Sequence, residues 1–338
     1  MQNMRAVTLD GGFGLDRLAL VKRPTPTPGP GQILVRVHAA SLNYRDLRMV
    51  QGQYYPHLSM PLVVASDAVG EVVALGSGVS EPAIGTRVCP LFAPNWQAGD
   101  PPENVFKSTL GGPSDGTLTE YLVAEPDNVV QVPSYLSDEQ AACLPCAALT
   151  AYSALFTLGA LRQGQHVLCL GTGGVSLFAL EFAKARGATV TITSKSDAKL
   201  ELAQRLGADH VLNYVANQAF GAVVKARFGR VDQVIEVGGA KTIDQSLVAL
   251  KPGGTLSLIG VLAGHSGPVN LMPILMRQLR VQGVFVGHKK SFMEMLAFMQ
   301  AHQIVPVVGP VFELADFAAA FEALATQEHF GKICIKLV

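Results

Sequence analysis

One segment, His166 to Ser194, limits the fold of this chain more than any other. It passes from an apolar run at His166–Leu170, through Gly171-Thr-Gly-Gly, to apolar residues at helical spacing over Val175–Arg186. A second run rich in β-branched residues, Thr189–Thr193, follows. This order predicts a buried strand, a tight turn, a helix and a second parallel strand, which together form a βαβ unit.

The glycines of this turn indicate a site for a dinucleotide. Gly171 and Gly173 permit the tight turn, and Gly174 keeps a side chain away from the backbone there. The N-terminus of the following helix offers free N–H groups and a positive dipole end, which favour a pyrophosphate. Ser176 stands where the fingerprint has a third Gly or Ala, so we expect looser helix-to-strand packing. The alternative is an ordinary glycine-rich turn of an α/β protein.

The residues after the second strand indicate which dinucleotide binds. Chains that select NAD place Asp or Glu there, about twenty residues after the first glycine, to bind the ribose 2′-hydroxyl. Here Ser194, Lys195 and Ser196 occupy that point, and Asp197 falls in the cap of the next helix. No carboxylate repels a 2′-phosphate, and Ser194, Lys195 and Lys199 can hold one, so we expect NADPH. The alternative is that both lysines are solvated residues at a helix start.

Composition excludes several classes of function. The 338 residues suffice for two domains, and 49% are hydrophobic, 15% are charged and the formal net charge is zero. This balance gives no electrostatic footprint for nucleic acid or an anionic membrane. Met1–Leu9 lacks the apolar region of a secretory signal, and five scattered cysteines form no disulfide framework. We therefore expect a soluble, cytoplasmic enzyme with a small-molecule substrate and no nucleic-acid or membrane partner.

The first third of the chain is rich in strand patterns. Strands are expected at Met4–Leu9, Gln32–Ala39 and Ala68–Leu75, with many turn glycines, which indicates an antiparallel, barrel-like β domain. The proline tract Pro24–Gly31 cannot be helical and reads as an extended connection. Cys89–Thr117 is long and rich in Pro, Gly, Asn and Asp, which favours a lid over the site.

Helices and strands alternate in the rest of the chain. Ser137 begins a capping box, and helical patterning continues over Ala141–Leu158 into the βαβ unit. Strands separated by helices predict a parallel sheet with crossover connections. The further expected strands are His210–Asn213, Gln233–Val237, Thr255–Ile259, Val281–Val286 and Lys332–Leu337, and the helices are Leu200–Leu206, Thr242–Leu250, Phe292–His302 and Ala315–Leu324.

Six short motifs are spread along nearly the whole chain. They are Pro28-Gly-Pro-Gly-Gln-Ile-Leu-Val, Ser41-Leu-Asn-Tyr-Arg-Asp, Asp67-Ala-Val-Gly-Glu-Val, Leu144-Pro-Cys-Ala-Ala-Leu-Thr-Ala-Tyr, Gly171-Thr-Gly-Gly-Val and Leu206-Gly-Ala-Asp-His-Val. Together they resemble the medium-chain dehydrogenase/reductase superfamily. The resemblance implies an α/β fold with a GroES-like β-rich domain at 1–147 and 288–338 and a Rossmann domain, a doubly wound parallel sheet, at 148–287.

The resemblance also bears on metal binding. Zinc alcohol dehydrogenases of this superfamily hold a catalytic metal with Cys, His and Cys, and alignment places Asn43, Ser66 and Cys146 at those positions. Asn and Ser are poor zinc ligands, and the lobe that would carry structural zinc has only Cys89, so no metal is expected. The chain most resembles the zinc-free, quinone oxidoreductase-like branch. Cys143 and Cys146 also match the C-x-x-C pattern of a redox pair, but their position on an apolar helix favours two small buried residues instead.

A metal-free site favours acceptors that delocalise charge. Hydride added to a quinone or an α,β-unsaturated carbonyl leaves a delocalised anion that hydrogen-bond donors can stabilise. The resemblance implies catalytic roles for Asn43 near the nicotinamide, for Asp46, which could orient Arg45 or a water, and for Tyr55 in the substrate cleft. Alternatively, Asn43 and Asp46 form a buried hydrogen-bonded turn, Tyr54 and Tyr55 form an aromatic rim, and solvent supplies the proton.

Cofactor contacts follow from the same resemblance. Thr150 is expected beside the nicotinamide, Tyr214 near the 2′-phosphate, and Lys332 reaching back to the cofactor phosphates. The remaining expected contacts, to the pyrophosphate and the carboxamide, are Gly173, Gly174, Val175, Gly260, Val261, Phe285, Val286 and Gly287.

The favoured function is NADPH-dependent reduction of a quinone or an α,β-unsaturated carbonyl. The alternatives are a metal-free alcohol dehydrogenase, an enoyl reductase that acts on a thioester, and an NADPH-binding protein without turnover. The apolar strands Thr255–Ile259 and Val281–Val286 are expected at sheet edges, where pairing across a two-fold axis would form a homodimer.

Overall fold

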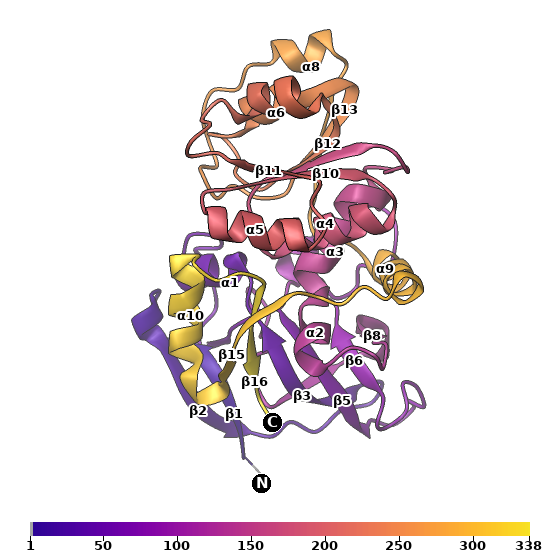
Figure 1. Ribbon diagram of the computed structural model, residues 1–338. Coiled ribbons are helices and arrows are strands. Elements are labelled where there is room, and N and C mark those ends of the chain that lie inside the picture. Colours follow the sequence, from indigo (N-terminus) through magenta and orange to yellow (C-terminus); the bar gives the residue numbers. More distant parts are fainter. Residues whose placement is uncertain (1–2) are drawn as a thin grey trace. The chain divides into compact units, whose positions relative to one another are not determined.

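A computed structural model describes residues 3–338, which divide into two compact units (Figure 1). The first unit runs to Ala147 and resumes over His288–Val338, and the second is Ala148–Gly287. Within residues 3–338, no helix has both the length and the apolar character that crossing a membrane requires.

The first unit is built mainly from β-structure. One sheet has the strand order β2-β1-β4, and a larger one has the order β15-β16-β3-β5-β6-β8, with β7 also paired to β3. The strands are β1 (Asn3–Leu9), β2 (Leu18–Pro24), β3 (Ile33–Ser41), β4 (Leu62–Val63), β5 (Asp67–Leu75), β6 (Arg87–Pro90), β7 (Tyr121–Ala124), β8 (Val129–Gln131), β15 (Val308–Glu313) and β16 (Lys332–Lys336). The helices are α1 (Tyr44–Val50), α2 (Asp138–Ala142), α9 (Lys289–His302) and α10 (Phe317–Thr326).

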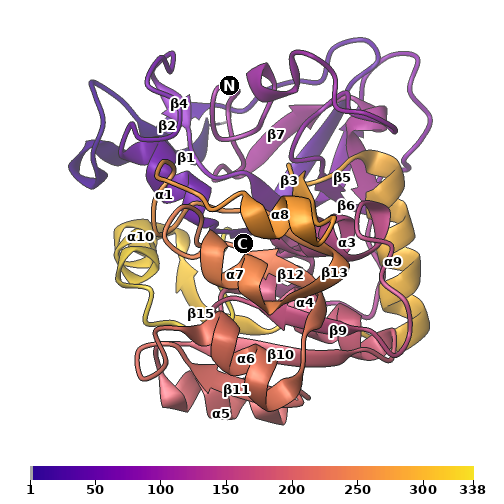
Figure 2. The same cartoon turned by 90° about the horizontal axis from the view of Figure 1, so that it is seen from above.

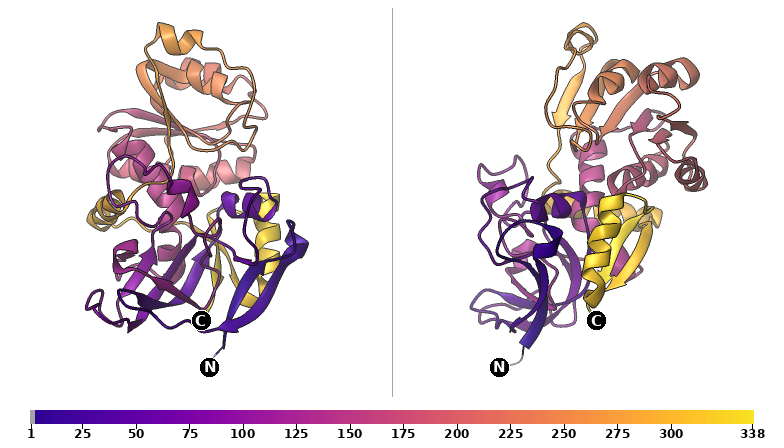
Figure 3. Two further views of the ribbon diagram at one scale, coloured as in Figure 1. Left: turned by 180° about the vertical axis from the view of Figure 1, so that it is seen from behind. Right: turned by 90° about the vertical axis from the view of Figure 1, so that its left-hand side faces the viewer.

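The C-terminal part of the chain completes this unit. β16 pairs antiparallel with β3, with Cys334 opposite Ser41, and parallel with β15. Helix α10 packs beside α1 and β16, as Figure 3 shows for the yellow C-terminal elements. Its buried Phe321 and Leu324 join Leu47 and Val50 of α1 in one apolar core. Removing this apolar surface from water holds the two ends of the chain in one unit.

The segment expected as a lid, Cys89–Thr117, is packed over much of its length. Phe92, Trp96 and Val105 are buried, and Gly116 and Thr117 donate backbone hydrogen bonds to Val63 and Ala65. Any lid movement must break these contacts.

The second unit contains a six-stranded sheet in which all strands are parallel. The strand order β11-β10-β9-β12-β13-β14 corresponds to 3-2-1-4-5-6 along the chain, which is the order of a dinucleotide-binding fold. The strands are β9 (His166–Cys169), β10 (Thr189–Ser194), β11 (His210–Asn213), β12 (Val231–Glu236), β13 (Leu250–Leu258) and β14 (Arg280–Gly283). The helices are α3 (Leu149–Tyr152), α4 (Gly174–Ala185), α5 (Asp197–Arg205), α6 (Phe220–Phe228), α7 (Ile243–Ala249) and α8 (Met272–Met276).

Helices cover both faces of this sheet. Figure 1 shows α4 and α5 on one face and α6 on the other, and in Figure 2 α6 and α7 lie in front of the strands. The predicted fold class, a β-rich unit with a doubly wound parallel sheet, is therefore confirmed.

Two expectations on the edge strands are wrong. β13, which covers Thr255–Ile259 in part, is an interior strand, because Thr255 pairs with β12 on one side and with β14 on the other. β14 ends at Gly283 rather than Val286, and Val286 has a left-handed φ of 47° that is incompatible with a strand. Only β14 of this pair lies at a sheet edge.

The helix expected over Ala141–Leu158 is interrupted. The Ser137 capping box is present, since the Ser137 hydroxyl accepts from the backbone N–H of Gln140, and the Gln140 side chain reaches back to Ser137. Beyond α2, two π-helical turns, Leu144–Ala148 and Ser153–Thr157, flank α3. Such turns widen a helix and occur frequently at functional sites.

Candidate active site and cofactor site

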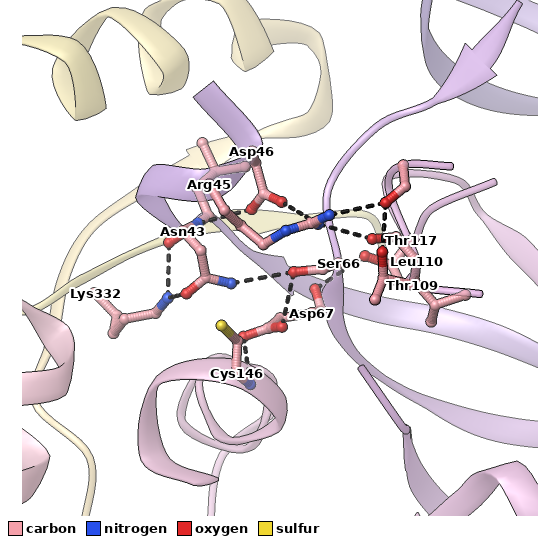
Figure 4. A network of polar contacts seen from close by, with 12 residues as sticks. Asn43, Arg45, Asp46, Ser66, Asp67, Thr109, Leu110, Thr117, Cys146 and Lys332 are labelled. Atoms are coloured by element: carbon pink, nitrogen blue, oxygen red, sulfur yellow. Dashed lines mark hydrogen bonds and ion pairs between the residues drawn. The ribbon is translucent and has the colours of Figure 1, made fainter. Parts of the chain in front are cut away.

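Four segments of the first unit bring polar side chains together in a buried cluster (Figure 4). Asn43 caps α1, Asp67 begins β5, Cys146 lies in a π-helical turn and Lys332 begins β16. Ser66 immediately precedes β5. Asn43, Ser66, Asp67 and Lys332 are each at most 8% exposed, so their polar groups depend on one another for partners.

A continuous chain of hydrogen bonds joins these residues. The Lys332 ammonium donates to the Leu42 carbonyl oxygen, at 2.7 Å, and to Asn43 Oδ1. Asn43 Nδ2 donates to Ser66 Oγ at 3.3 Å, and Ser66 Oγ donates to Asp67 Oδ1 at 3.0 Å. The other carboxylate oxygen of Asp67 accepts from the Cys146 backbone N–H at 3.1 Å.

Burial changes the protonation of this cluster. It raises the pKa of Asp67 to about 6, against the opposing effect of the Lys332 charge. Burial also raises the pKa of Asp46, against the opposing charges of Arg45 and Lys332. The pKa of the Cys146 thiol rises as well, because it is buried and lies near Asp67, so this group stays protonated at neutral pH.

Asp46 and Arg45 fasten α1 to the neighbouring loop. Asp46 accepts from the Asn43 backbone N–H at 2.8 Å, which completes a capping box, and contacts Arg45 Nη1 at 3.2 Å. The Arg45 guanidinium donates to the Leu110 carbonyl at 2.8 Å and to the Gly112 carbonyl at 2.9 Å. The predicted contact between Asp46 and Arg45 is thus present, and it belongs to a buried turn.

The expected substrate-cleft tyrosine lies in the loop after α1. Tyr55 is half-buried there, and its neighbour Tyr54 places its ring 5.6 Å from the Arg45 guanidinium carbon. Among residues 3–338, no hydrogen bond joins Tyr55 to Asn43 or Asp46. Its role stays a prediction.

The second unit places the glycine turn at the carboxyl end of β9. Gly171 has a φ of 73°, a conformation that favours glycine, and Gly173 caps α4, which begins at Gly174. Val175 follows in the first turn of α4. The Ser176 hydroxyl donates to the Leu170 carbonyl at 2.7 Å. The expectation that Ser176 loosens the packing is wrong, because this buried hydrogen bond ties the helix to the strand.

The residues expected around a 2′-phosphate lie at the ends of two neighbouring strands. Ser194 ends β10, and the Tyr214 backbone N–H donates to its carbonyl at 3.1 Å. Lys195 is exposed, and Lys199 lies in the first turn of α5, whose cap is Ser196. Asp197, the nearest carboxylate in sequence, accepts from Asn213 Nδ2 at 2.8 Å.

The remaining expected cofactor residues of this unit lie after strands or in α3. Gly260 and Val261 follow β13, and Val261 is 52% exposed. Phe285, Val286 and Gly287 follow β14, and Thr150 is buried in α3. Lys332 does not belong to this unit, since its amine lies against Asn43.

Two groups escaped sequence reasoning. Asp67 begins a recognised motif, but no pattern shows that its carboxylate faces Ser66. Glu236, at the end of β12, is fully buried and accepts from the backbone N–H groups of Gly238 and Gly239 and from Thr242 and Ser246 hydroxyls. The Glu-Val-Gly-Gly sequence, an acid before a glycine pair, was the available signal.

Two family models match separate parts of this chain. Residues 29–134 match the alcohol dehydrogenase GroES-like domain, and residues 174–301 match the zinc-binding dehydrogenase family. A zinc-type alcohol dehydrogenase-like protein of Schizosaccharomyces pombe is 40% identical over 99% of both chains. An acryloyl-coenzyme A reductase of Sulfurisphaera tokodaii is 28% identical over 98% of this chain and 100% of its own. The crystal structure of a putative alcohol dehydrogenase from Sinorhizobium meliloti has a TM-score of 0.92 and 36% identity, with both chains covered fully.

Proposed function

This chain belongs to the medium-chain dehydrogenase/reductase superfamily, and we propose that it reduces a quinone or an α,β-unsaturated carbonyl with NADPH and without a metal. The observation that carries the proposal is the contact between the Lys332 ammonium and Asn43 Oδ1, at a position where zinc enzymes of this superfamily have a ligand.

The residues at this position do not fit a zinc ion. Asn43 and Ser66 are neutral, and their oxygen atoms are already engaged: Asn43 Oδ1 accepts from Lys332, and Ser66 Oγ accepts from Asn43 Nδ2 and donates to Asp67. A buried ammonium repels a dication, and the one available sulfur is a thiol whose pKa is raised. A catalytic zinc requires three protein ligands, with cysteine as thiolate. The proposed reaction therefore does not use a metal.

The chemistry of the acceptor follows from this donor set. Bound NADPH supplies a hydride, which leaves a negative charge on the acceptor oxygen. Reduction of an isolated carbonyl would concentrate that charge in an alkoxide, which calls for a Lewis acid. A conjugated acceptor spreads the charge as an enolate or a hydroquinone anion, for which an oriented N–H donor such as Asn43 suffices. We assign Asn43 to this role, Asp46 to holding the turn that carries it, and Tyr55 to the acceptor pocket.

Several features of the second unit support NADPH as the cofactor. We assign the 2′-phosphate to Ser194, Lys195 and Tyr214, which lie at or just after the carboxyl ends of β10 and β11, and Asn213 already engages the Asp197 carboxylate. We assign the pyrophosphate to the glycine turn at Gly171–Val175 and its helix N-terminus. Binding of NADPH and NADH, measured by cofactor fluorescence, tests this preference. Equal affinities would contradict it.

A homodimer in the cytoplasm is also part of the proposal. β14 lies at the edge of the sheet with all its residues exposed, and neighbouring α8 exposes apolar side chains. A free strand edge with exposed apolar side chains next to it favours pairing with a second copy. All five cysteines are free thiols, as in a reducing compartment, which supports a cytoplasmic location.

Light scattering tests the proposed dimer. At micromolar concentration it should give twice the chain mass, and Val281→Asp should give a monomer. A monomeric wild type would remove the dimer. The exposed apolar residues are Leu271, Met272, Leu275, Met276 and Val281.

A second candidate is reduction of an enoyl thioester, which the similarity to an acryloyl-coenzyme A reductase favours. One assay separates the candidates: NADPH consumption with a quinone, an enone, an enoyl thioester and an aldehyde, each with added zinc or with a chelator. Turnover of the quinone or enone despite the chelator supports the proposal. Turnover of the thioester alone selects the second candidate. Turnover of the aldehyde only after zinc addition refutes the metal-free site, and no turnover at all indicates a binding protein.

A further inference from the structure

Lys332 is held in place by the backbone on both sides of its strand. Its own N–H donates to the Val307 carbonyl at 2.9 Å, and the Leu42 N–H donates to the Ile333 carbonyl at 3.0 Å. Gly331, with a φ of 79° and the Val307 and Gly309 backbones close by, provides the turn that starts β16 here. The lysine is 5% exposed, so its ammonium has little freedom to reach other partners.

This ammonium determines which way the Asn43 amide faces. A carboxamide has one oxygen acceptor and an NH₂ group with two donors. Lys332 Nζ carries only donors, so it can donate to the oxygen of Asn43 but cannot form a hydrogen bond with its NH₂ group. The NH₂ group must therefore face the opposite way, where it donates to Ser66 Oγ at 3.3 Å. That bond uses one N–H of Asn43. The amide also lies beside the Asp67 carboxyl, whose pKa it helps to lower, so a ligand oxygen must compete with Asp67 for the second N–H.

The lysine also brings a positive charge to a site with two buried carboxyl groups. Arg45 contacts Asp46 directly, and the Lys332 charge favours the ionised forms of both Asp46 and Asp67. A cation on the oxygen side of an amide polarises it and makes its N–H groups better donors, most of all where little water screens the charge. Lys332 thus acts on the very group that we assign to the acceptor oxygen.

We propose that Lys332 is a positioning residue, which orients and polarises the Asn43 amide so that one N–H is presented to the acceptor oxygen. This role differs from the contact with cofactor phosphates that the family resemblance implies. It rests on the proposed function, because the delocalised anion that Asn43 would meet forms on hydride transfer to a conjugated carbonyl or quinone.

The two roles predict different kinetics for Lys332→Met. If Lys332 positions Asn43, kcat should fall about 10- to 100-fold while the Kd for NADPH changes less than about twofold. Lys332→Gln keeps an N–H donor for Asn43 Oδ1 without the charge, so its kcat should lie between those of the wild type and Lys332→Met. Lys336→Met, on the same strand but with a 44% exposed side chain, is the matched control and should keep wild-type kinetics.

A double-mutant cycle tests whether the two residues act together. Asn43→Ala alone should lower kcat, and adding Lys332→Met should lower it by less than about threefold more, because the group that Lys332 orients is gone. Asn43→Asp keeps an acceptor for Lys332 but has no N–H donor, so it should fold and match Asn43→Ala in kcat. Should Lys332→Met not fold, Lys332→Gln keeps the test of the lysine decisive, because positioning predicts a lowered kcat with an unchanged Kd for NADPH.

Some results would overturn the proposal. A loss of NADPH affinity of about tenfold or more in Lys332→Met, with kcat intact, would assign the lysine to the cofactor phosphates. Additive losses in the double variant would show that Asn43 and Lys332 act independently. An Asn43→Asp variant with wild-type activity would show that the reaction does not need an N–H donor at this position. A wild type that turns over no conjugated acceptor would instead refute the proposed function, and the NADPH affinity of Lys332→Met would still decide the phosphate role.

Discussion

The protonation of His166 makes the stability of the second unit depend on pH. This residue begins β9, is 7% exposed, and places Nε2 2.8 Å from the Thr191 hydroxyl. Burial lowers its pKa from 6.5 to about 4, and the nearby charges of His210 and Lys251 act in the same direction. Asp232 and Asp209 oppose this shift but do not outweigh it.

The sign of the effect follows from which state binds the proton. Below pH 6.5 the unfolded chain protonates this histidine, whereas the folded chain keeps it neutral down to about pH 4. Acid therefore favours unfolding over this interval. The two pKa values give a loss of about 2.5 kcal/mol in the free energy of unfolding between about pH 7.5 and about pH 4.5.

His166→Gln isolates this contribution, because glutamine keeps a hydrogen-bonding group for Thr191 and does not titrate. Urea unfolding of both proteins, followed by circular dichroism across this pH range, gives the difference in free energy at each pH. Relative to its own value near neutral pH, the variant should lose about 2.5 kcal/mol less than the wild type by about pH 4.5. Parallel pH profiles would refute the reasoning, as would a His166 imidazole that titrates near pH 6.5 by NMR.

Three further substitutions test contacts of the two units. Ser176→Ala removes the 2.7 Å hydrogen bond to Leu170 and should lower the free energy of unfolding by about 1–2 kcal/mol in urea, and an unchanged value would mean that the bond contributes nothing. Arg45→Lys cannot hold the Leu110 and Gly112 carbonyls with one planar group, so limited proteolysis should cleave that loop faster than in the wild type, and equal rates would contradict its anchoring role. Glu236→Gln replaces a carboxylate, which only accepts hydrogen bonds, with an amide whose NH₂ group would face the donors of Gly238 or Ser246. This change should lower the free energy of unfolding by about 2–3 kcal/mol in thermal unfolding, and an unchanged melting temperature would contradict it.

Local signals predicted most of the second unit. The glycine turn, the alternating apolar runs and the Ser137 capping box all act over a few residues, and each appears in the structure where the sequence placed it. Elements with weak local signals were missed. Helix α1 has only seven residues and begins within a motif, so it is too short to show a helical repeat of apolar residues. Strand β2 ends in the proline tract and is mostly exposed, so it lacks the alternation that a buried face imposes.

Errors arose where pairing rather than pattern decides. The predicted strands Thr255–Ile259 and Val281–Val286 are both apolar enough for a buried or an edge position, and only the strand order distinguishes them. The same limit applies to the candidate site. Motifs selected Asn43 and Asp46, which are three residues apart, whereas the contact between Asn43 and Lys332 joins residues separated by 289 positions. No local pattern reports such a contact.

The pairing of β16 with β3 therefore has a consequence beyond the fold. β3 leads directly into Leu42 and Asn43, and the register of β16 sets Lys332 against them. A slip of one residue would turn the lysine to the other face of the sheet and place Ile333 beside the amide. An apolar side chain there would leave Asn43 Oδ1 without its donor and two buried carboxyl groups with one cation fewer. The register that packs the apolar core of the first unit is thus the same one that supplies charge to the candidate active site.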